Sequence, residues 1–332
     1  MVVDGLLAWY EENKRELPWR RDREPYHVWV SEIMLQQTRV EAVIPYYERF
    51  LAALPTVEAL AGADEAQLLK LWEGLGYYSR VRNMQKAAKA IVQMGGFPRT
   101  AAELKKLSGF GEYTSGAVAS IAFGERAAAV DGNVLRVWAR MERIGESIKM
   151  PSVRRACAQA VREAMPKDCD PGAYTQALME LGATICTPRS PACAKCPVQA
   201  HCGAFAAEET EAYPIQEAKP VKTVEEFDVH LIVQGGKALV RQRPQTGLLA
   251  NMWEFPHGEE KVRVQSGFAM EVKHVFTHKI WLMRGVRAQL LDKADGQWVD
   301  AQQLRALPMS SSMEKFRQYL LESGEMNDAG AD

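Results

Sequence analysis

Four of the six cysteines are concentrated in one short segment, and no other feature of the chain restricts its fold more strongly. The segment reads TICTPRSPACAKCPVQAHC and has the spacing C-x6-C-x2-C-x5-C. Clustered cysteines in a chain without export features are typical of metal binding rather than of disulfides. Four thiolates from a proline-containing loop can hold a zinc ion or an iron–sulfur cluster, and the spacing alone is compatible with both. The predicted ligands are Cys186, Cys193, Cys196 and Cys202.

The length and composition of the chain indicate a globular protein of two domains. Its 332 residues can form two hydrophobic cores, and 47% hydrophobic and 25% charged residues are ordinary values. No apolar run reaches the roughly 18 to 20 residues of a membrane span, and the first residues are acidic where a signal peptide has lysines. We therefore expect a cytoplasmic protein without a membrane contact. The net charge of −1, with only a slight basic excess in residues 1–200, does not by itself indicate a nucleic-acid ligand.

The spacing of apolar residues divides the chain into two parts. From residue 5 to about 205 they recur every three or four residues, as in Val28–Gln37 and Gly172–Ile185, which predicts an all-α domain. A stretch with few apolar residues, several acids and two prolines then predicts a linker. The predicted parts are a helical domain (1–206), a linker (207–222), an α+β domain (223–324) and a tail (325–332).

Beyond the linker the apolar period becomes that of a β-strand. Apolar and more polar residues alternate from Phe227 to Val233, and a Gly235-Gly236 turn separates this strand from a second one, KALVRQRP. The β-rich stretch EVKHVFTHKIWLMRGVRAQLL and a final helix near Met313–Leu321 follow. The second domain is therefore predicted to contain both strands and helices.

A glycine turn joins two predicted helices in LKKLSGFGEYTSGAVASIAFG. Gly109 and Gly111 let the backbone approach another molecule, and the amides at the start of the second helix suit a phosphate oxygen. By itself such a turn is more often a plain helix connection. About twenty residues later, in AAAVDGNVLRV, Asp131 lies where another helix begins, and alone either Asp131 or Asn133 would be interpreted as an N-cap.

Together these segments resemble the helix–hairpin–helix, Gly/Pro-rich-loop, aspartate superfamily of DNA glycosylases, over nearly all of residues 5–205. The cysteine loop, which follows a helix ending in LGATIC, resembles that of the endonuclease III and MutY families. A [4Fe–4S] cluster is therefore implied rather than zinc. One departure is Ser108, where the superfamily has a proline before the first hairpin glycine, and a less rigid turn is implied.

SEIMLQQT, GLGYYSR and VDGNV occur in this order and resemble the MutY family, whose members remove adenine from DNA. Breaking a glycosidic bond through an oxocarbenium-like transition state requires an acid for the leaving base and an anion for the sugar. Glu32 lies in an apolar helix, where burial would raise its pKa and keep it protonated near neutral pH. Without this context Glu32 would be interpreted as a solvated glutamate. Asp131 is the predicted anion, acting electrostatically or by transient covalent attachment.

The resemblance to the MutY family implies a catalytic group of four side chains. Glu32 protonates adenine at N7 and then helps to activate water, while Asp131 supports the sugar cation. Tyr113 and Asn133 complete this catalytic group.

The same resemblance implies contacts with the base and the DNA strands. Gln37 and Tyr77 match residues that insert into the duplex beside the oxidised guanine while adenine is flipped out. The adenine pocket is predicted to contain Trp19, Arg20 and Gln176. For Tyr77 and Trp19 a place in the hydrophobic core is the alternative.

Tyr113 distinguishes between two kinds of glycosylase. Bifunctional relatives such as endonuclease III have a Schiff-base lysine at this hairpin position, and its amine attacks the sugar. Arg136, after VDGNVL, cannot act as a nucleophile either. A monofunctional enzyme that uses water is therefore predicted. A bifunctional oxidised-base glycosylase and a non-catalytic DNA-binding protein are the alternatives.

The second domain resembles the Nudix fold in TGLLANMWEFPHGEE. The following residues, KVRVQSGFAMEV, lack the glutamates with which a Nudix hydrolase holds magnesium, so a binding module without hydrolysis is implied. Phe276, Thr277 and His278 resemble a Phe-Ser-His loop with which the MutY family checks for oxidised guanine. Threonine keeps the hydroxyl group and adds a methyl group. A plain strand with an incidental histidine is the alternative.

These resemblances imply one main partner, double-stranded DNA with adenine opposite 8-oxoguanine or guanine. We expect the protein to act as a monomer in the cytoplasm, in association with the nucleoid. Contacts with other repair proteins are compatible with the linker, but the sequence identifies none.

Overall fold

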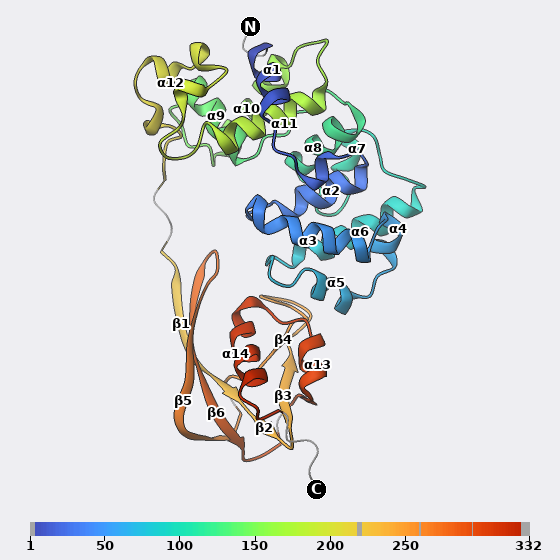
Figure 1. Ribbon diagram of the computed structural model, residues 1–332, viewed down its shortest axis with the longest axis vertical. Helices are drawn as coiled ribbons and strands as arrows, with labels where there is room; N and C mark the ends of the chain where they lie inside the picture. Colours follow the sequence, from blue (N-terminus) through green and yellow to red (C-terminus); the bar gives the residue numbers. More distant parts are fainter. Residues whose placement is uncertain (1–3, 218–220, 259, 294, 327–332) are drawn as a thin grey trace. The chain divides into compact units, whose positions relative to one another are not determined.

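The chain is described by a computed structural model, which divides into two compact units (Figure 1). The described residues are 4–217, 221–258, 260–293 and 295–326. We call Met1–Gly62 with Asn83–Ala218 the helical unit, and Ala63–Arg82 with Lys219–Asp332 the C-terminal unit. Residues 63–82 therefore pack with the C-terminal part of the chain, although their sequence is that of the helical part. The predicted tail lies outside the described residues from 327 onward.

Residues 4–217 contain helices and connecting loops, and none of them is in a strand. This confirms the predicted helical fold. No helix in the described part of the chain is long and apolar enough to cross a membrane. The helices are α1 (Asp4–Asn13), α2 (Pro25–Met34), α3 (Val40–Ala53), α4 (Val57–Gly62), α5 (Glu65–Leu71), α6 (Ser79–Gln93), α7 (Ala101–Leu104), α8 (Glu112–Phe123), α9 (Gly132–Met141), α10 (Pro151–Ala164), α11 (Pro171–Thr184) and α12 (Gly203–Ala206).

The core of the helical unit is built around α2, α8, α9 and α11. Trp29 of α2 is fully buried and stacks on Phe110, with the ring centroids 5.0 Å apart. Buried Val134 and Trp138 of α9 belong to the same hydrophobic cluster as Leu181 of α11. Burial of apolar area is the main source of helix stability in a folded protein. The same packing brings polar residues of these helices to one cavity, which is described below.

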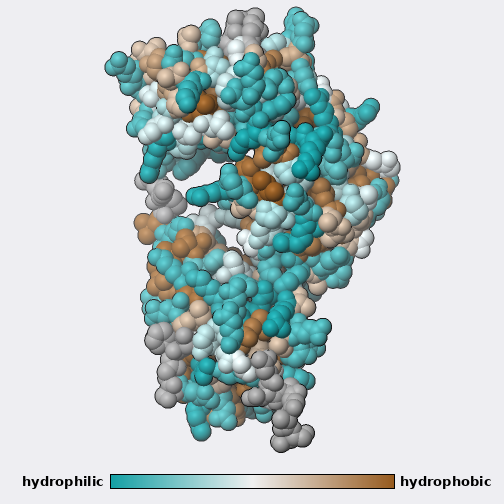
Figure 2. All heavy atoms as spheres, in the orientation of Figure 1, coloured by the Kyte–Doolittle hydropathy of each residue, from teal (hydrophilic) through white to brown (hydrophobic). Residues whose placement is uncertain are grey.

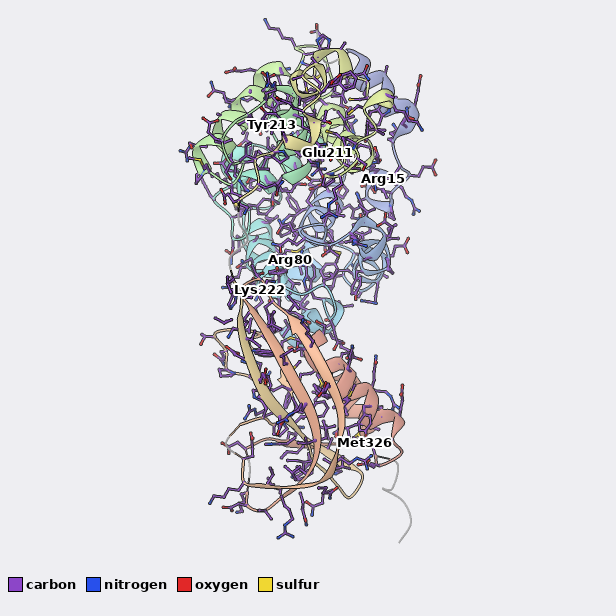
Figure 3. All side chains as sticks on the ribbon, turned by 90° about the vertical axis from the view of Figure 1, so that its left-hand side faces the viewer. Arg15, Arg80, Glu211, Tyr213, Lys222 and Met326 are labelled. Carbon is purple, nitrogen blue, oxygen red and sulfur yellow. The ribbon has the colours of Figure 1, made fainter. Side chains whose placement is uncertain are left out.

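The C-terminal unit contains strands and helices, as predicted. Three long strands lie side by side in Figures 1 and 3, with Lys222 at one end of them. Their order is β1-β6-β5, with β1 parallel to β6 and β5 antiparallel to it. A second sheet contains β2, β3, β4 and β7. The bounds are β1 (Thr223–Leu231), β2 (Val233–Gln234), β3 (Lys237–Gln242), β4 (Trp253–Glu254), β5 (Val262–Val275), β6 (Lys279–Leu290), β7 (Gln297–Val299), α13 (Ala301–Ala306) and α14 (Ser311–Glu322).

The predicted hairpin at Gly235-Gly236 is present, because both glycines have positive φ and β2 pairs with β3. The preceding strand differs from the prediction. It is interrupted at Ile232, so that β1 pairs with β6 and only β2 continues into the hairpin. Alternation of apolar and polar residues predicts that a segment is extended, but it does not predict which strand the segment pairs with. Here the chain passes from one sheet to the other at Ile232.

The core of the C-terminal unit lies between strands and the last helix. Phe255, Val299 and Phe316 are fully buried in one cluster with Met283 and Leu320. The unit therefore has a hydrophobic core of its own, as expected for a separate domain. Much of the surface of the chain in Figure 2 is hydrophilic, and the apolar residues on the visible face form small patches.

Candidate active site

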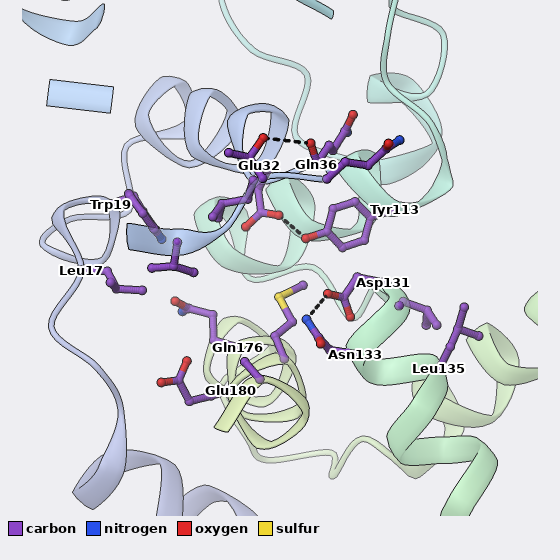
Figure 4. A pocket seen from close by; sticks show the side chains of 18 of the residues that line it. Leu17, Trp19, Glu32, Gln36, Tyr113, Asp131, Asn133, Leu135, Gln176 and Glu180 are labelled. Atoms are coloured by element: carbon purple, nitrogen blue, oxygen red, sulfur yellow. Dashed lines mark hydrogen bonds between the residues drawn. The ribbon is translucent and has the colours of Figure 1, made fainter. Parts of the chain in front are cut away.

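A cavity of about 660 Å³ opens in the helical unit and brings together most of the residues predicted for the site (Figure 4). Its walls come from the segment before α2, from α2, from the start of α8 and α9, and from α11. The predicted residues among its lining are Trp19, Arg20, Glu32, Gln37, Tyr113, Asp131, Asn133 and Gln176. Side chains separated by more than a hundred residues thus share one pocket of the size of a small-molecule site.

Glu32 lies on the buried face of α2, and its side chain points toward Tyr113 (Figure 4). Only 6% of Glu32 is exposed. Burial raises the pKa of its carboxyl to about 7, and the hydroxyl of Tyr113, which donates a hydrogen bond to Glu32 Oε2, acts in the opposite direction. Burial also raises the pKa of Tyr113 well above its ordinary value, so this phenol remains a neutral donor. Glu32 can therefore carry or lose a proton near neutral pH.

Asp131 caps the first turn of α9 and also faces the cavity. Its Oδ1 accepts a hydrogen bond of 2.8 Å from the Val134 amide, and its Oδ2 accepts one of 2.8 Å from Asn133 Nδ2. Burial raises the pKa of Asp131, and both hydrogen bonds oppose this shift. The N-cap interpretation and the catalytic interpretation of Asp131 are thus compatible, because the carboxylate that caps α9 through Oδ1 also lines the cavity.

A buried ion cluster forms one wall of the cavity, and sequence reasoning missed two of its members. Glu180 of α11 is 1% exposed and accepts hydrogen bonds from Arg15 Nε at 2.7 Å and from Arg20 Nη2 at 2.7 Å. Although burial alone would raise it, these two hydrogen bonds lower the pKa of Glu180. Arg20, a predicted pocket residue, is therefore held in place by Glu180. The sequence signal was an acidic residue inside the apolar helix YTQALMELGATIC.

The other predicted pocket residues are also in place. Trp19 is 7% exposed, packs edge-on against Tyr47 with centroids 5.3 Å apart, and lines the cavity. Gln176 of α11 points into the same space as Glu180 (Figure 4), and its Nε2 donates to the Gly172 carbonyl at 3.3 Å. Trp19 thus belongs both to the core and to the pocket.

The two residues predicted to insert into DNA have the same unusual backbone conformation. Gln37 has a φ of 61° and Tyr77 a φ of 48°. Both angles lie in the left-handed region, which residues other than glycine rarely adopt. Both are exposed, Tyr77 to 47%. Gln37 lines the cavity of the helical unit, whereas Tyr77 belongs to the C-terminal unit. Such strain is retained where a side chain must project from a loop in a fixed direction.

Phe276, Thr277 and His278 form the turn between β5 and β6, as a loop of this kind requires. The Phe276 ring packs on Trp281, with centroids 4.7 Å apart, and Thr277 and His278 are exposed. Thr277 Oγ1 lies 2.7 Å from Tyr77 Oη. The structure thus joins two residues that the sequence assigned to different domains.

The glycine turn lies between α7 and α8. Gly109 has φ of 78°, and an added Cβ would meet Asn83 Cβ at 2.9 Å, so that only glycine fits. Gly111 is the N-cap of α8 and nothing would obstruct a Cβ there, which leaves its surroundings open for a ligand. Ser108 Oγ donates to Asn83 Oδ1 at 3.1 Å. This hydrogen bond restrains the turn where the superfamily has a proline.

Cys186, Cys193, Cys196 and Cys202 line one small cavity together with Arg140. Burial, and the neighbouring Cys186 and Cys202 sulfurs, raise the pKa of Cys196 to about 11, because converging thiolates repel each other unless a cation is bound. Arg140 Nη1 donates to Cys186 Sγ at 3.2 Å. Four cysteine thiolates that line one cavity are the usual ligand set of a [4Fe–4S] cluster. The residues therefore fit an iron–sulfur cluster.

Arg136 connects the active site with the cysteine loop. Its Nη2 donates to Asn133 Oδ1 at 2.9 Å and to the Gly182 carbonyl at 2.8 Å, and its Nε donates to the Cys186 carbonyl at 2.8 Å. α9 and α11 cross so closely here that a Cβ on Gly182 would lie 2.6 Å from Asn133 Cβ. The position of Asn133, and through it that of Asp131, thus depends on both neighbours.

Known families match three segments of the chain. Residues 30–163 match the model of the HhH-GPD superfamily base excision DNA repair protein, residues 186–202 that of the iron-sulfur binding domain of endonuclease III, and residues 228–319 that of the NUDIX domain. A solved thermostable thymine-DNA glycosylase is similar with a TM-score of 0.54 and 27% identity, covering 62% of this chain and 95% of that chain. The fold is that of a helix–hairpin–helix protein of base excision DNA repair. The predicted iron–sulfur cofactor is confirmed.

Curated relatives narrow this class further. The chain is 40% identical to adenine DNA glycosylase of Arabidopsis thaliana over 297 residues, covering 76% of this chain and 46% of the relative. It is 34% identical to adenine DNA glycosylase of Mus musculus over 398 residues, covering 95% of this chain and 77% of the relative. The chain belongs to the adenine DNA glycosylase family. It spans about half the length of the Arabidopsis thaliana and Homo sapiens relatives, at 46% and 56%.

Proposed function

We propose that the protein is a monofunctional DNA glycosylase that removes adenine paired with 8-oxoguanine or guanine. One observation carries this proposal: a single cavity holds Glu32, with its pKa raised to about 7, together with Asp131. An acid and an anion in different environments are what hydrolysis of an N-glycosidic bond requires. The proposed ligand is double-stranded DNA, bound by a monomer in the cytoplasm.

In the proposed reaction adenine leaves the duplex and enters the cavity. Glu32 donates its proton to N7 of adenine, the bond between N9 and C1′ breaks, and the electron pair of this bond stays with the base. Asp131 stabilises the positive charge that develops on the sugar. Water then adds to C1′ and gives its proton to the Glu32 carboxylate, which restores the starting state.

The lining of the cavity supports a reaction without strand cleavage. Strand cleavage by β-elimination needs an amine that forms a Schiff base with the sugar. Among the described residues that line the cavity there is no lysine, and Tyr113 occupies the hairpin position. The lining also contains arginines, and a guanidinium group is a poor nucleophile.

The preference for oxidised guanine rests on the loop of Phe276, Thr277 and His278. Thr277 Oγ1 and His278 can offer hydrogen-bonding groups to the N7–H or O8 of 8-oxoguanine, which guanine lacks. The Thr277 hydroxyl already contacts Tyr77, the residue proposed to stand beside that base.

Base release from a panel of duplexes tests the proposal. Adenine would be placed opposite 8-oxoguanine, guanine or cytosine, and strand cleavage would be scored in the same gel. We expect release in the first two duplexes and strand breaks only after alkali treatment. Strong strand cleavage without alkali would contradict the monofunctional assignment. If Phe276→Ala and His278→Ala left the preference for the 8-oxoguanine duplex over the guanine duplex as it is in the wild type, the role of the loop would be contradicted.

A further inference from the structure

The segment Ala63–Arg82 is attached to the rest of the C-terminal unit by charged side chains of α5, of the turn that follows it and of α14. Glu73 Oε1 accepts a hydrogen bond of 2.9 Å from Arg317 Nη2 and one of 3.0 Å from the Met309 amide. Lys70 Nζ donates to the Arg305 carbonyl at 2.7 Å and lies 2.6 Å from Glu73 Oε2. We call Lys70, Glu73 and Arg317 the clamp.

The clamp is buried at Arg317 and half-buried at Lys70 and Glu73, and it complements the ends of two helices. Arg317 is 6% exposed and its Nη1 also donates to the Leu307 carbonyl at 2.9 Å. Lys70 meets the C-terminal end of α13, where carbonyls lack partners within the helix, and Glu73 meets the amide at the approach to α14. Removing the Glu73 charge would leave the Arg317 guanidinium buried with fewer partners, which is unfavourable.

A second contact fixes the far end of the same segment. Arg82 Nε donates to Glu65 Oε1 at 2.7 Å, and Asn251 Nδ2 donates to the same oxygen at 3.1 Å. Arg82 also donates to the Ala250 carbonyl. Both ends of the loop that carries Tyr77 are therefore attached to the C-terminal unit.

The loop between these attachments is held by its own hydrogen bonds. Trp72 is fully buried, and its Nε1 donates to the Gly76 carbonyl at 3.0 Å. Arg80 Nη2 donates to the Leu75 carbonyl at 3.0 Å, and its guanidinium lies 5.7 Å from the Tyr77 ring centroid. The left-handed φ of Tyr77 is held by these contacts. A displacement of α5 would therefore move Tyr77 as well.

We propose that Lys70, Glu73 and Arg317 are positioning residues through which the C-terminal unit places Tyr77 next to Thr277. This inference rests on the proposed function, because Tyr77 and Thr277 are assigned there to the base opposite adenine. The clamp does not touch DNA or the reacting atoms. Its effect on the reaction is to keep Tyr77 Oη and Thr277 Oγ1 within hydrogen-bonding distance. Tyr77, which inserts into the duplex, and the loop of Thr277, which recognises oxidised guanine, then contact the same base.

Hydrogen exchange on the full chain tests the clamp without any need for activity. In Glu73→Gln we expect the amides of residues 63–82 to exchange about tenfold faster, since one hydrogen bond to a charged group is lost. The matched control is Glu58→Gln, which removes the same charge from an exposed position on α4. Unchanged protection of residues 63–82 in Glu73→Gln would overturn the proposal. If this variant does not fold, Lys70→Met removes the more exposed arm of the clamp and serves in its place.

Kinetics distinguish positioning from a merely structural role. In Glu73→Gln we expect the ratio of adenine release opposite 8-oxoguanine to release opposite guanine to fall about tenfold. Because the clamp acts through Tyr77, adding Glu73→Gln to Tyr77→Phe should produce no further loss in this ratio. The proposal would be overturned if the two substitutions reduced this ratio independently, so that their losses multiply. It would also be overturned if Glu73→Gln left the ratio unchanged while the amides of residues 63–82 exchanged faster. If the wild-type protein releases no adenine from any duplex, the proposed function fails, and the exchange experiment alone decides on the clamp.

Discussion

The two units each bury a glutamate among polar partners, but with opposite effects on its charge. In the helical unit, burial raises the pKa of Glu32 to about 7, and its hydrogen-bonding partner is the neutral hydroxyl of Tyr113. In the C-terminal unit burial alone would also raise the pKa of Glu254, but His257 and Arg243 lower it to about 2. Arg241 donates to the other oxygen of Glu254 at 3.0 Å.

The pKa values of Glu32 and Glu254 differ because of the partners of each carboxyl group and not because of its exposed fraction. Only 6% of Glu32 and 3% of Glu254 is exposed. A carboxyl group with a neutral donor can exchange a proton near neutral pH, whereas one enclosed by arginines remains an anion. Glu32 is therefore suited to acid catalysis, and Glu254 is suited to holding strands β3 and β4 together.

The largest effect is expected for Glu32→Gln, because it removes the proposed proton donor while keeping the shape of the side chain. Base release should fall by between a hundredfold and ten-thousandfold, the usual range for a general acid. Single-turnover release from a duplex with adenine opposite 8-oxoguanine measures this, with duplex binding as a check on folding. A loss of less than tenfold would show that the proton comes from elsewhere.

Glu254→Gln should act on stability instead of on chemistry. Without the anion, the Arg241 and Arg243 guanidinium groups lose a buried partner, and the free energy of unfolding should fall by about 3 kcal/mol. Urea unfolding measures this, with Glu271→Gln at an exposed position of β5 as the control. Below the unfolding transition its base release should stay within a few-fold of wild type. Activity lost as completely as in Glu32→Gln would remove the contrast between the two glutamates.

The pH dependence of stability should have opposite signs at the two positions. The pKa of Glu32 rises on folding from 4.5 to about 7, so its contribution to stability is complete below pH 4.5 and lost as the pH rises through 7. Compared with wild type, Glu32→Gln should gain up to roughly 3 kcal/mol between pH 5 and pH 8. The lowered pKa of Glu254 predicts a contribution that is present above 4.5 and lost toward pH 2.

Base release provides a second test of the same titration. Because the free enzyme needs a protonated Glu32, its rate should fall about tenfold per pH unit above pH 7. A rate that is flat up to pH 9 would contradict the assignment of Glu32 as the acid.

A smaller effect is expected for Arg136→Met. Unlike Arg243, Arg136 donates its hydrogen bond to Asn133, which in turn donates to the Asp131 carboxylate. Burial raises the pKa of Asp131 and the charge of Arg136 opposes this rise, so loss of Arg136 should shift Asp131 and weaken the electrostatic support of this carboxylate. We expect base release to fall roughly tenfold, the effect of one hydrogen bond to a charged group. Iron content should stay at the wild-type level, and Arg143→Met, at an exposed ion pair, is the control. Iron loss in proportion to the rate would place the effect in the cysteine loop instead.

Much of the fold could be predicted from the sequence, because periodicity and turn residues are local properties. The helices around Glu32 and Asp131 and the hairpin at Gly235-Gly236 are examples. The attachment of residues 63–82 to the C-terminal unit could not be predicted, since it depends on pairs such as Glu73 and Arg317 that lie far apart in sequence. The same holds for the change of sheet at Ile232.

The site was predictable where a residue belongs to a recognisable pattern. Glu32, Asp131 and the cysteines stand in such patterns. Glu32 and Asp131 line one cavity, and the four cysteines line another. Glu180 was missed because its place in an apolar helix does not show which basic residues it pairs with. Its function appears only when α11 packs beside Arg15 and Arg20.

The close crossing of α9 and α11 has a consequence for the tolerance of the chain to mutation. Gly182 carries no functional group, yet even the methyl group of alanine would collide with Asn133. A scoring scheme based on chemical similarity would rate Gly182→Ala as mild. We expect Gly182→Ala instead to reduce base release as strongly as direct replacements of the catalytic group do. A residue without a functional side chain can therefore be as sensitive to substitution as the residues of the proposed site.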